Sequence, residues 1–227
     1  MFARIKDIKV VAFDWDGTLV NSFPEIGEAF QRTLTKLNMP AMDPDVVRRH
    51  VGGGHDAMFR AIIDELGLSI DVPDKDYFWG AFYTCYQPRN IHLFEGVLAS
   101  LQELKSKGFK LYIATNKPSH SFSVEYQELT VLHGLFERVL CADEYVGKPD
   151  PAMLRLICDD AGIQKHQMLM VGDTSFDVLA ARANGSPVAA VACGNMRLDE
   201  LTALNADILC KTTPEVCATL IDECVPV

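Results

Sequence analysis

The sequence predicts an α/β protein: a Rossmann-like parallel sheet with helices on both faces and an all-helical segment inserted after the first strand. Three observations support this fold class. Apolar runs alternate with helical segments from residue 96 to the C-terminal region, a pattern typical of a parallel sheet covered by helices. Several of these runs end abruptly at polar residues. Residues 23–90, by contrast, show helical periodicity without a comparable strand.

The first strand is predicted at residues 10–13, a continuous apolar run typical of a strand buried on both faces. Asp14 and Asp16 follow it, one residue apart. Period-two alternation points both side chains the same way, and ligands of open parallel sheets bind beyond the carboxyl ends of the strands. These carboxylates therefore mark a candidate site, although Asp-Gly at a strand end is also a common polar turn.

A first helix is predicted from residue 23. Ser22 is its expected N-cap, Pro24 lies in the first turn and Glu25 occupies the capping-box position. Further helices are expected at residues 45–51, 57–66 and 74–86. We therefore divide the chain into a core of residues 1–22 and 91–227 and a helical domain of residues 23–90, with hinges near residues 21–22 and 91–95.

A glycine-rich loop lies within the helical domain, in the run Arg48-Arg49-His50-Val51-Gly52-Gly53-Gly54-His55. Glycines let a backbone approach a ligand closely, and a neighbouring arginine or histidine could meet a second anionic group. We name Arg49, Gly53 and His55 as candidate ligand contacts. The alternative is a helix that ends in a glycine turn, with the arginines on a solvated face.

The remaining elements alternate. Helices are predicted at residues 96–107, 119–132, 151–161 and 177–183, and strands at 109–114, 139–141, 168–171 and 188–191. Polar residues follow two of these strands: Thr115-Asn116-Lys117-Pro118 and Gly172-Asp173-Thr174, the latter with Asp177 shortly after. Between them, the stiff turn Gly147-Lys148-Pro149-Asp150-Pro151 contributes a lysine.

In this order, the four segments resemble the motifs of the haloacid dehalogenase superfamily, in the subgroup that includes phosphoglycolate phosphatases. The first motif is Asp14-Trp15-Asp16-Gly17-Thr18-Leu19-Val20, and the others contain Thr115, Lys148 and Asp173 with Asp177. The resemblance implies that the predicted sheet is this family's core and that residues 23–90 are its small helical cap. It also implies that residues 206–209 and 214–221 are the last short strand and helix of that core.

The resemblance also implies roles for these residues. Asp14 would be the nucleophile that forms an aspartyl-phosphate, and Asp16 the general acid and then the base. Lys148 would hold Asp14 and a phosphate oxygen, while Thr115 and the Asn116 backbone would donate hydrogen bonds to the phosphoryl group, with Gly17 as a further substrate contact. Family dehalogenases lack a carboxylate at the position of Asp16, so its presence favours phosphoester chemistry.

Several carboxylates near one phosphate would repel it, which argues for a bound cation. Mg²⁺ prefers oxygen ligands and commonly bridges carboxylates to a substrate phosphate. The family pattern places Asp14, the main-chain carbonyl of Asp16 and Asp173 on the metal, with Asp177 as a nearby or water-mediated partner.

Phosphoglycolate is the leading substrate expectation, but close relatives of the same fold act on inorganic pyrophosphate, nucleoside monophosphates and sugar phosphates. A sugar-phosphate mutase of the beta-phosphoglucomutase type is an alternative. Such relatives carry a histidine shortly after the first motif, whereas residues 21–49 contain none and Ile26 lies near the expected place. A phospholigand-binding protein without catalysis is a third possibility, and loss of Asp14, Asp16, Lys148 or Asp173 would favour it; all four are present.

Composition limits the partners. The formal net charge is -10 and the sequence pI is about 5.0, which argues against binding to nucleic acid or an anionic membrane surface. Seven cysteines without a Cys-x-x-Cys pair indicate buried thiols in a reducing compartment. With no apolar run long enough for a membrane span and no signal-peptide pattern in residues 1–9, we expect a cytoplasmic monomer or homodimer that acts on a small phosphorylated metabolite.

Overall fold

The structure is a computed structural model that describes residues 5–67 and 74–224. Its main sheet has six parallel strands in the order β5-β4-β1-β6-β7-β8. The strands are β1 (Val10–Phe13), β4 (Lys110–Thr115), β5 (Arg138–Cys141), β6 (Met168–Gly172), β7 (Val188–Val191) and β8 (Ile208–Cys210). β1 lies between β4 and β6. The later strands extend the sheet from β1 in two opposite directions, through β4 and β5 on one side and through β6, β7 and β8 on the other. Open parallel sheets bind ligands at the point where the strand order reverses in this way.

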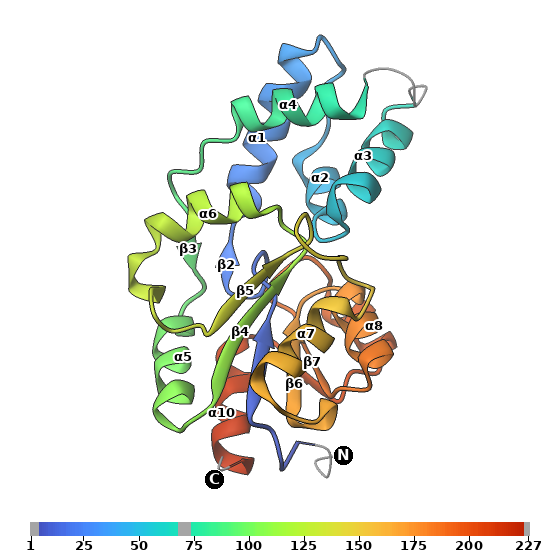
Figure 1. The fold of residues 1–227 in the computed structure, drawn as a ribbon. Coiled ribbons are helices and arrows are strands. Elements are labelled where there is room, and N and C mark those ends of the chain that lie inside the picture. Colours follow the sequence, from blue (N-terminus) through green and yellow to red (C-terminus); the bar gives the residue numbers. More distant parts are fainter. Residues whose placement is uncertain (1–4, 68–73, 225–227) are drawn as a thin grey trace.

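Helices cover both faces of this sheet, as predicted (Figure 1). Alternation along the strands explains the two cores: Val11 and Phe13 face one apolar cluster, whereas Val10 and Ala12 face the other. The helices of this part are α5 (Val97–Ser106), α6 (Ser119–Glu128), α7 (Ala152–Ala161), α8 (Ser175–Asn184), α9 (Leu198–Ala203) and α10 (Thr213–Glu223), with short 3-10 turns at Thr130–Leu132 and Lys165–Gln167.

Four helices between residues 22 and 86 form a separate layer above the carboxyl ends of the strands (Figure 1). They are α1 (Phe23–Lys36), α2 (Pro44–His50), α3 (Gly54–Glu65) and α4 (Lys75–Cys85), and we call them the helical insert. Their buried side chains form an apolar cluster of their own, drawn entirely from residues 26–86. The chain enters the insert after β2 (Val20–Asn21) and returns to the core at β3 (His92–Leu93), and these two short strands pair in antiparallel orientation.

Most predicted elements are present, with bounds shifted by a few residues. The sequence did not predict α9, β2 or β3, which are short and lack a clear period. Ser22 is the N-cap residue of α1, as expected, but its side chain makes no capping bond and donates to Asp16 instead. Glu25 likewise accepts a hydrogen bond from the backbone N–H of Asn90, at 3.0 Å, rather than closing a capping box.

Among the described residues, no helix combines the length and apolar character needed to cross a membrane. The expectation about a signal peptide falls partly on residues 1–4, which lie outside the described part of the chain.

Candidate active site

Three strand ends bring the predicted polar residues together. Asp14 follows β1, Thr115 ends β4, and Asp173 follows β6. β1 pairs with both neighbours in parallel, and Phe13 is level with Ile113 on one side and with Val171 on the other. Thr115 and Asp173, both far from Asp14 in the sequence, therefore reach the same edge of the sheet as Asp14, below the helical insert.

Lys148 connects two of the carboxylates. Its Nζ lies 2.9 Å from Asp14 Oδ1 and 2.6 Å from Asp177 Oδ1, and all three side chains are buried. Burial by itself would lower the pKa of Lys148, but the charges of Asp14 and Asp177 outweigh it and raise that pKa. Lys148 is therefore held as a cation between the two acids.

Asp14, Asp173 and Asp177 form a buried acidic cluster whose carboxylate oxygens lie within 4.8 Å of one another. Burial, with a contribution from Asp177, raises the pKa of Asp14 to about 6 even though Lys148 opposes the shift. Burial and the charges of Asp14 and Asp177 also raise the pKa of Asp173 well above its usual value. The cluster therefore has more negative charge than Lys148 alone neutralises.

The donor set fits a divalent cation such as Mg²⁺, because all three groups offer hard carboxylate oxygens. Two glycines leave room around Asp173. A Cβ atom at Gly17 or at Gly194 would collide with the Asp173 carboxylate, and Gly17 has a φ of +78°, which favours glycine in any case. Gly17 thus keeps space beside the acidic cluster.

Asp173 and Asp177 are fixed by hydrogen bonds from the surrounding loops. Asp173 accepts from the Thr18 hydroxyl at 3.1 Å and from the backbone N–H of Asn195 at 2.6 Å. Asp177 accepts from the hydroxyl and backbone N–H of Thr174, at 2.7 and 3.0 Å, which also caps α8. Because the other oxygen of Asp177 pairs with Lys148, this residue is positioned to orient Lys148 as well as to complete the cluster.

Asp16 lies on the side of the site nearer the insert. It pairs with Lys117, whose Nζ is 3.0 Å from Asp16 Oδ1, and it accepts a hydrogen bond from Ser22. Asp14 and Asp16 both line a cavity between the sheet and the insert, which agrees with the predicted common direction of their side chains. Ser22 and Lys117 therefore orient the carboxylate that the family resemblance makes the acid and base.

A buried polar network extends from Lys117. Lys117 Nζ is 2.8 Å from Glu125 Oε1, and Glu125 Oε2 accepts from the Trp15 indole N–H at 2.6 Å. Tyr86, just after α4 of the insert, donates its hydroxyl hydrogen to Glu125 and lies 3.3 Å from Lys117. This network joins the insert to the loop that bears Asp16, so the position of the insert and the orientation of Asp16 are physically linked.

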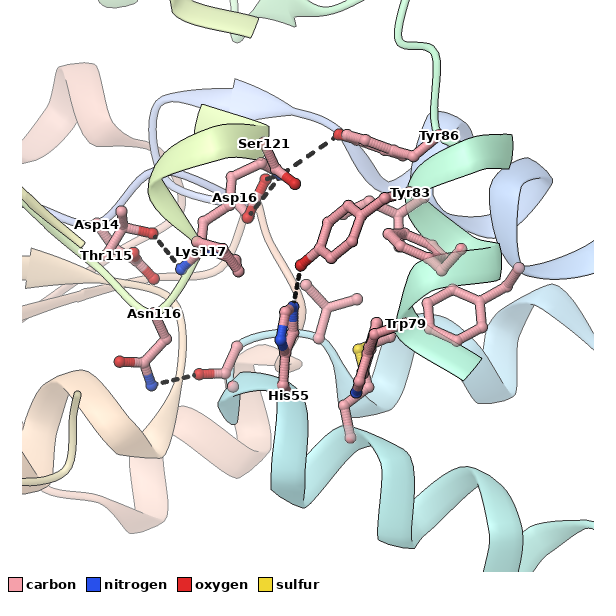
Figure 2. A pocket seen from close by; sticks show the side chains of 18 residues that line it. Asp14, Asp16, His55, Trp79, Tyr83, Tyr86, Thr115, Asn116, Lys117 and Ser121 are labelled. Carbon is pink, nitrogen blue, oxygen red and sulfur yellow. Dashed lines mark hydrogen bonds and ion pairs between the residues drawn. The ribbon is translucent and has the colours of Figure 1, made fainter. Parts of the chain in front are cut away.

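Asn116 makes a second connection to the insert. Its side chain donates to the Lys148 carbonyl and accepts from the Lys148 backbone N–H, each at 2.8 Å, and it also donates to the Gly52 carbonyl at 2.8 Å. Figure 2 shows the Asn116 side chain directed toward the insert, away from Asp16. The side chain of Asn116 therefore positions Lys148 and the glycine loop.

The side of the cavity formed by the sheet is mainly polar, and the side formed by the insert is mainly apolar (Figure 2). Asp14, Asp16, Thr115, Asn116 and Lys117 lie on the side of the sheet, and the insert contributes mainly apolar and aromatic side chains. The residues from the insert, including its glycine loop, are Ile26, Phe30, Val51, Gly52, Gly54, His55, Met58, Trp79, Phe82, Tyr83 and Tyr86.

The glycine loop is placed only in part as expected. His55 lines the cavity, where its ring stacks on Trp79 with ring centroids 4.0 Å apart. Arg49 is exposed and does not line the cavity, and Gly53 lies against Phe176 of α8. Neighbouring Arg48 donates to the Gly194 carbonyl at 2.7 Å instead of entering the cavity.

Sequence reasoning placed none of Lys117, Glu125, Tyr86 and Ser22 in the site, and expected Ser22 only as a helix N-cap. Lys117 was visible as a cation at a strand end. Glu125 had no such signal, because a glutamate within a predicted helix is ordinarily on a solvated face and only the packing of α6 buries it.

Comparison with known proteins agrees with this geometry. Residues 11–191 match the family model of the haloacid dehalogenase-like hydrolases. The chain belongs to this family and is an enzyme of the phosphatase type within it.

Individual relatives cover almost the whole chain. It is 32% identical to a phosphoglycolate phosphatase from Vibrio parahaemolyticus, over 93% of this chain and 95% of the relative. It is 35% identical to a plasmid-encoded phosphoglycolate phosphatase from Cupriavidus necator, over 88% and 87% of the two chains. A crystal structure described as a predicted phosphoglycolate phosphatase from Haemophilus somnus superposes with a TM-score of 0.85 at 25% identity, covering 95% of this chain and 99% of the other.

Proposed function

We propose that this protein is a Mg²⁺-dependent phosphatase that hydrolyses a small phosphorylated metabolite through an aspartyl-phosphate on Asp14. The observation that carries the proposal is the contact of Lys148 with both Asp14 and Asp177 in the acidic cluster, next to a cavity that Asp14 and Asp16 line. This arrangement offers a nucleophile, an acid and charge neutralisation around one phosphoryl group.

In the first step, an Asp14 oxygen attacks phosphorus while the bond from phosphorus to the leaving oxygen breaks. Asp16 donates a proton to that oxygen, and Thr115 supplies a hydrogen-bond donor for the phosphoryl oxygens. In the second step, water attacks phosphorus, Asp16 takes a proton from the water, and the bond to Asp14 breaks to release phosphate. Lys117 and Ser22 keep Asp16 oriented through both proton transfers.

The metal would be held by Asp14, Asp173 and the main-chain carbonyl of Asp16, with Asp177 beside it. When bound, Mg²⁺ supplies positive charge that offsets the repulsion between the carboxylates and the phosphate. Gly17 and Gly194 leave the space that this requires next to Asp173.

Phosphoglycolate is the reference substrate for this proposal, because the two relatives are named phosphoglycolate phosphatases. A mutase is less well supported: Ile26, which lies near the position expected for the mutase histidine, lines the cavity and offers no proton-transfer group there. The same cavity, bounded by the insert, is the place where the part of the substrate beyond the phosphate would be bound.

The test is phosphate release from phosphoglycolate, pyrophosphate, nucleoside monophosphates and sugar phosphates, with Mg²⁺ or with EDTA, by the unsubstituted protein and by Asp14→Asn. We expect release that requires Mg²⁺ and that Asp14→Asn reduces at least about a thousandfold, since removing a nucleophile eliminates the covalent route. Release that persists in Asp14→Asn would refute the mechanism, and conversion of hexose 1-phosphate to the 6-phosphate would favour the mutase.

A further inference from the structure

The insert presents an aromatic wall to the cavity, formed by Phe30, Trp79, Phe82, Tyr83 and Tyr86. The rings support one another: Trp79 and Phe82 meet edge to face at 5.4 Å, and Phe82 stacks on Tyr86 at 5.3 Å, between ring centroids. Phe30 lies 4.7 Å from Phe82 and is fully buried. The wall is therefore a packed surface and not a set of isolated exposed rings.

Two of the polar side chains in the cavity lining, those of His55 and Ser121, are uncharged. His55 stacks on Trp79 and exchanges a hydrogen bond with the Tyr83 hydroxyl, as Figure 2 shows. Burial lowers the pKa of His55 to about 4, so the ring carries no charge at neutral pH. Ser121 adds a hydroxyl on the side of the sheet. These groups offer hydrogen bonds without positive charge.

The one lysine among the described residues that line the cavity is already paired with two carboxylates. Lys117 lies 3.0 Å from Asp16 and 2.8 Å from Glu125, and it is almost completely buried. Arg48 binds the Gly194 carbonyl and lies over the Phe23 ring, 5.0 Å from its centroid, outside this cavity. A second anionic group on the substrate would therefore meet Asp16 and aromatic rings, with no uncommitted cation from the lining.

We propose that the preferred substrate is a phosphate monoester whose leaving group bears no negative charge and places an apolar or aromatic portion against Phe30, Trp79 and Phe82. This inference rests on the proposed phosphatase function and specifies its substrate class. The physical reason is twofold. Transfer of a carboxylate into this cavity costs hydration that no uncommitted cation among the described lining residues offsets, whereas an apolar portion gains free energy in proportion to the area that it removes from water.

Two matched pairs of phosphate esters test the inference. Hydroxyethyl phosphate and phosphoglycolate differ in a neutral hydroxymethyl group against a carboxylate, and benzyl phosphate and para-carboxybenzyl phosphate differ in one carboxylate on the ring. We expect kcat/KM to be at least about tenfold higher for the uncharged member of each pair, and higher for benzyl phosphate than for hydroxyethyl phosphate. Mg²⁺-dependent phosphate release is the readout.

Substitutions at the wall connect this preference to the structure. His55→Lys adds a cation to the lining and should raise the kcat/KM ratio of phosphoglycolate to hydroxyethyl phosphate at least about tenfold, whereas His55→Gln keeps the position neutral and should leave the ratio unchanged. Trp79→Ala should reduce the preference for benzyl phosphate. Tyr77→Ala is the matched control, because Tyr77 is on the same helix, is 66% exposed and does not line the cavity.

The outcomes separate the two levels of the proposal. Phosphate release with the carboxylated esters equal to or better than their neutral partners would overturn the inference and leave the phosphatase function intact. No Mg²⁺-dependent release from any of the four esters or from the metabolite panel would overturn the proposed function and this inference with it. An unchanged ratio in a folded His55→Lys variant would also contradict the assignment of this wall to the leaving group.

Discussion

The ammonium group of Lys117 lies 3.0 Å from the carboxylate of Asp16, although the two residues are 101 positions apart in the chain. Glu125 holds the same ammonium group from the other side, at 2.8 Å, and Tyr86 of the helical insert donates to Glu125. The orientation of Asp16 therefore depends on a buried charge network that includes a residue of the insert.

Removal of Glu125 should expose this dependence. Glu125→Leu leaves the buried Lys117 with one carboxylate partner and leaves Trp15 Nε1 and the Tyr86 hydroxyl without their acceptor. We expect a loss of about 3–5 kcal/mol in the free energy of unfolding, because a buried ion pair is broken and two further buried donors lose their acceptor. Urea unfolding measures it, and Glu125→Gln, which retains an acceptor, should cost less. Equal losses in the two variants would refute a charge-based role.

Tyr86 should couple the insert to the core. Tyr86→Phe removes only the hydroxyl that reaches Glu125 and Lys117, and we expect a loss of about 1–3 kcal/mol because it leaves buried partners unsatisfied. A double-mutant cycle with Glu125→Gln measures the coupling between the two side chains. Additive effects would show that the contact between insert and core contributes nothing at this point.

The acidic cluster should respond to metal. Because Asp14, Asp173 and Asp177 converge and Lys148 is the one cation paired with them in the described part of the chain, Mg²⁺ should raise the midpoint of thermal unfolding by mass action. Asp173→Asn should weaken that response at least about tenfold in the apparent Mg²⁺ affinity, since it removes one anionic ligand. Differential scanning fluorimetry across a Mg²⁺ titration, with Ca²⁺ as a comparison, provides the measurement. An identical response in Asp173→Asn would place the ion elsewhere.

Glycines at two positions should differ in their tolerance of alanine. Gly17→Ala places a Cβ against Asp173 at a positive φ, so we expect a stability loss of more than about 1 kcal/mol and a loss of phosphate release. Gly80→Ala is the control, because Gly80 lies within α4 and a Cβ there meets nothing within 4 Å. It should be neutral or stabilise by up to about 1 kcal/mol. A fully active, stable Gly17→Ala variant would contradict the crowded geometry.

His55 should titrate well below an ordinary histidine. Burial lowers its pKa to about 4, and Lys75 and Lys117 add to this shift, whereas Asp143 and Asp56 oppose it. Since the unfolded chain binds a proton near pH 6.5 and the folded protein only near 4, the contribution of His55 is fully present above pH 6.5 and is lost as the pH falls to about 4. NMR titration of the ring measures the pKa, and unfolding of His55→Gln should lack this component. A value near 6.5 would show that the ring is solvated.

The sequence alone determined the sheet and most of its helices, because continuous apolar runs and helical periodicity are local properties of the chain. It also singled out Asp14, Asp16, Thr115 and Asp173 at or just beyond predicted strand ends and Lys148 in a stiff turn, and the resemblance of these segments to the family motifs grouped them into one site. Capping was less predictable. The Ser22 hydroxyl had a local partner in the sequence pattern, but in the folded protein Asp16 competes for it successfully.

Only the tertiary structure decided what surrounds these motifs. Glu125 is buried because α6 packs against the strand-end loops, and Arg49 is exposed because α2 turns that face away from the cavity. Neither outcome follows from local periodicity, since a charged residue within a helix has the same pattern on a solvated or a buried face. The chemistry at the strand ends is thus encoded locally, whereas the contacts of the insert with the core, and with them the character of the cavity, depend on long-range packing.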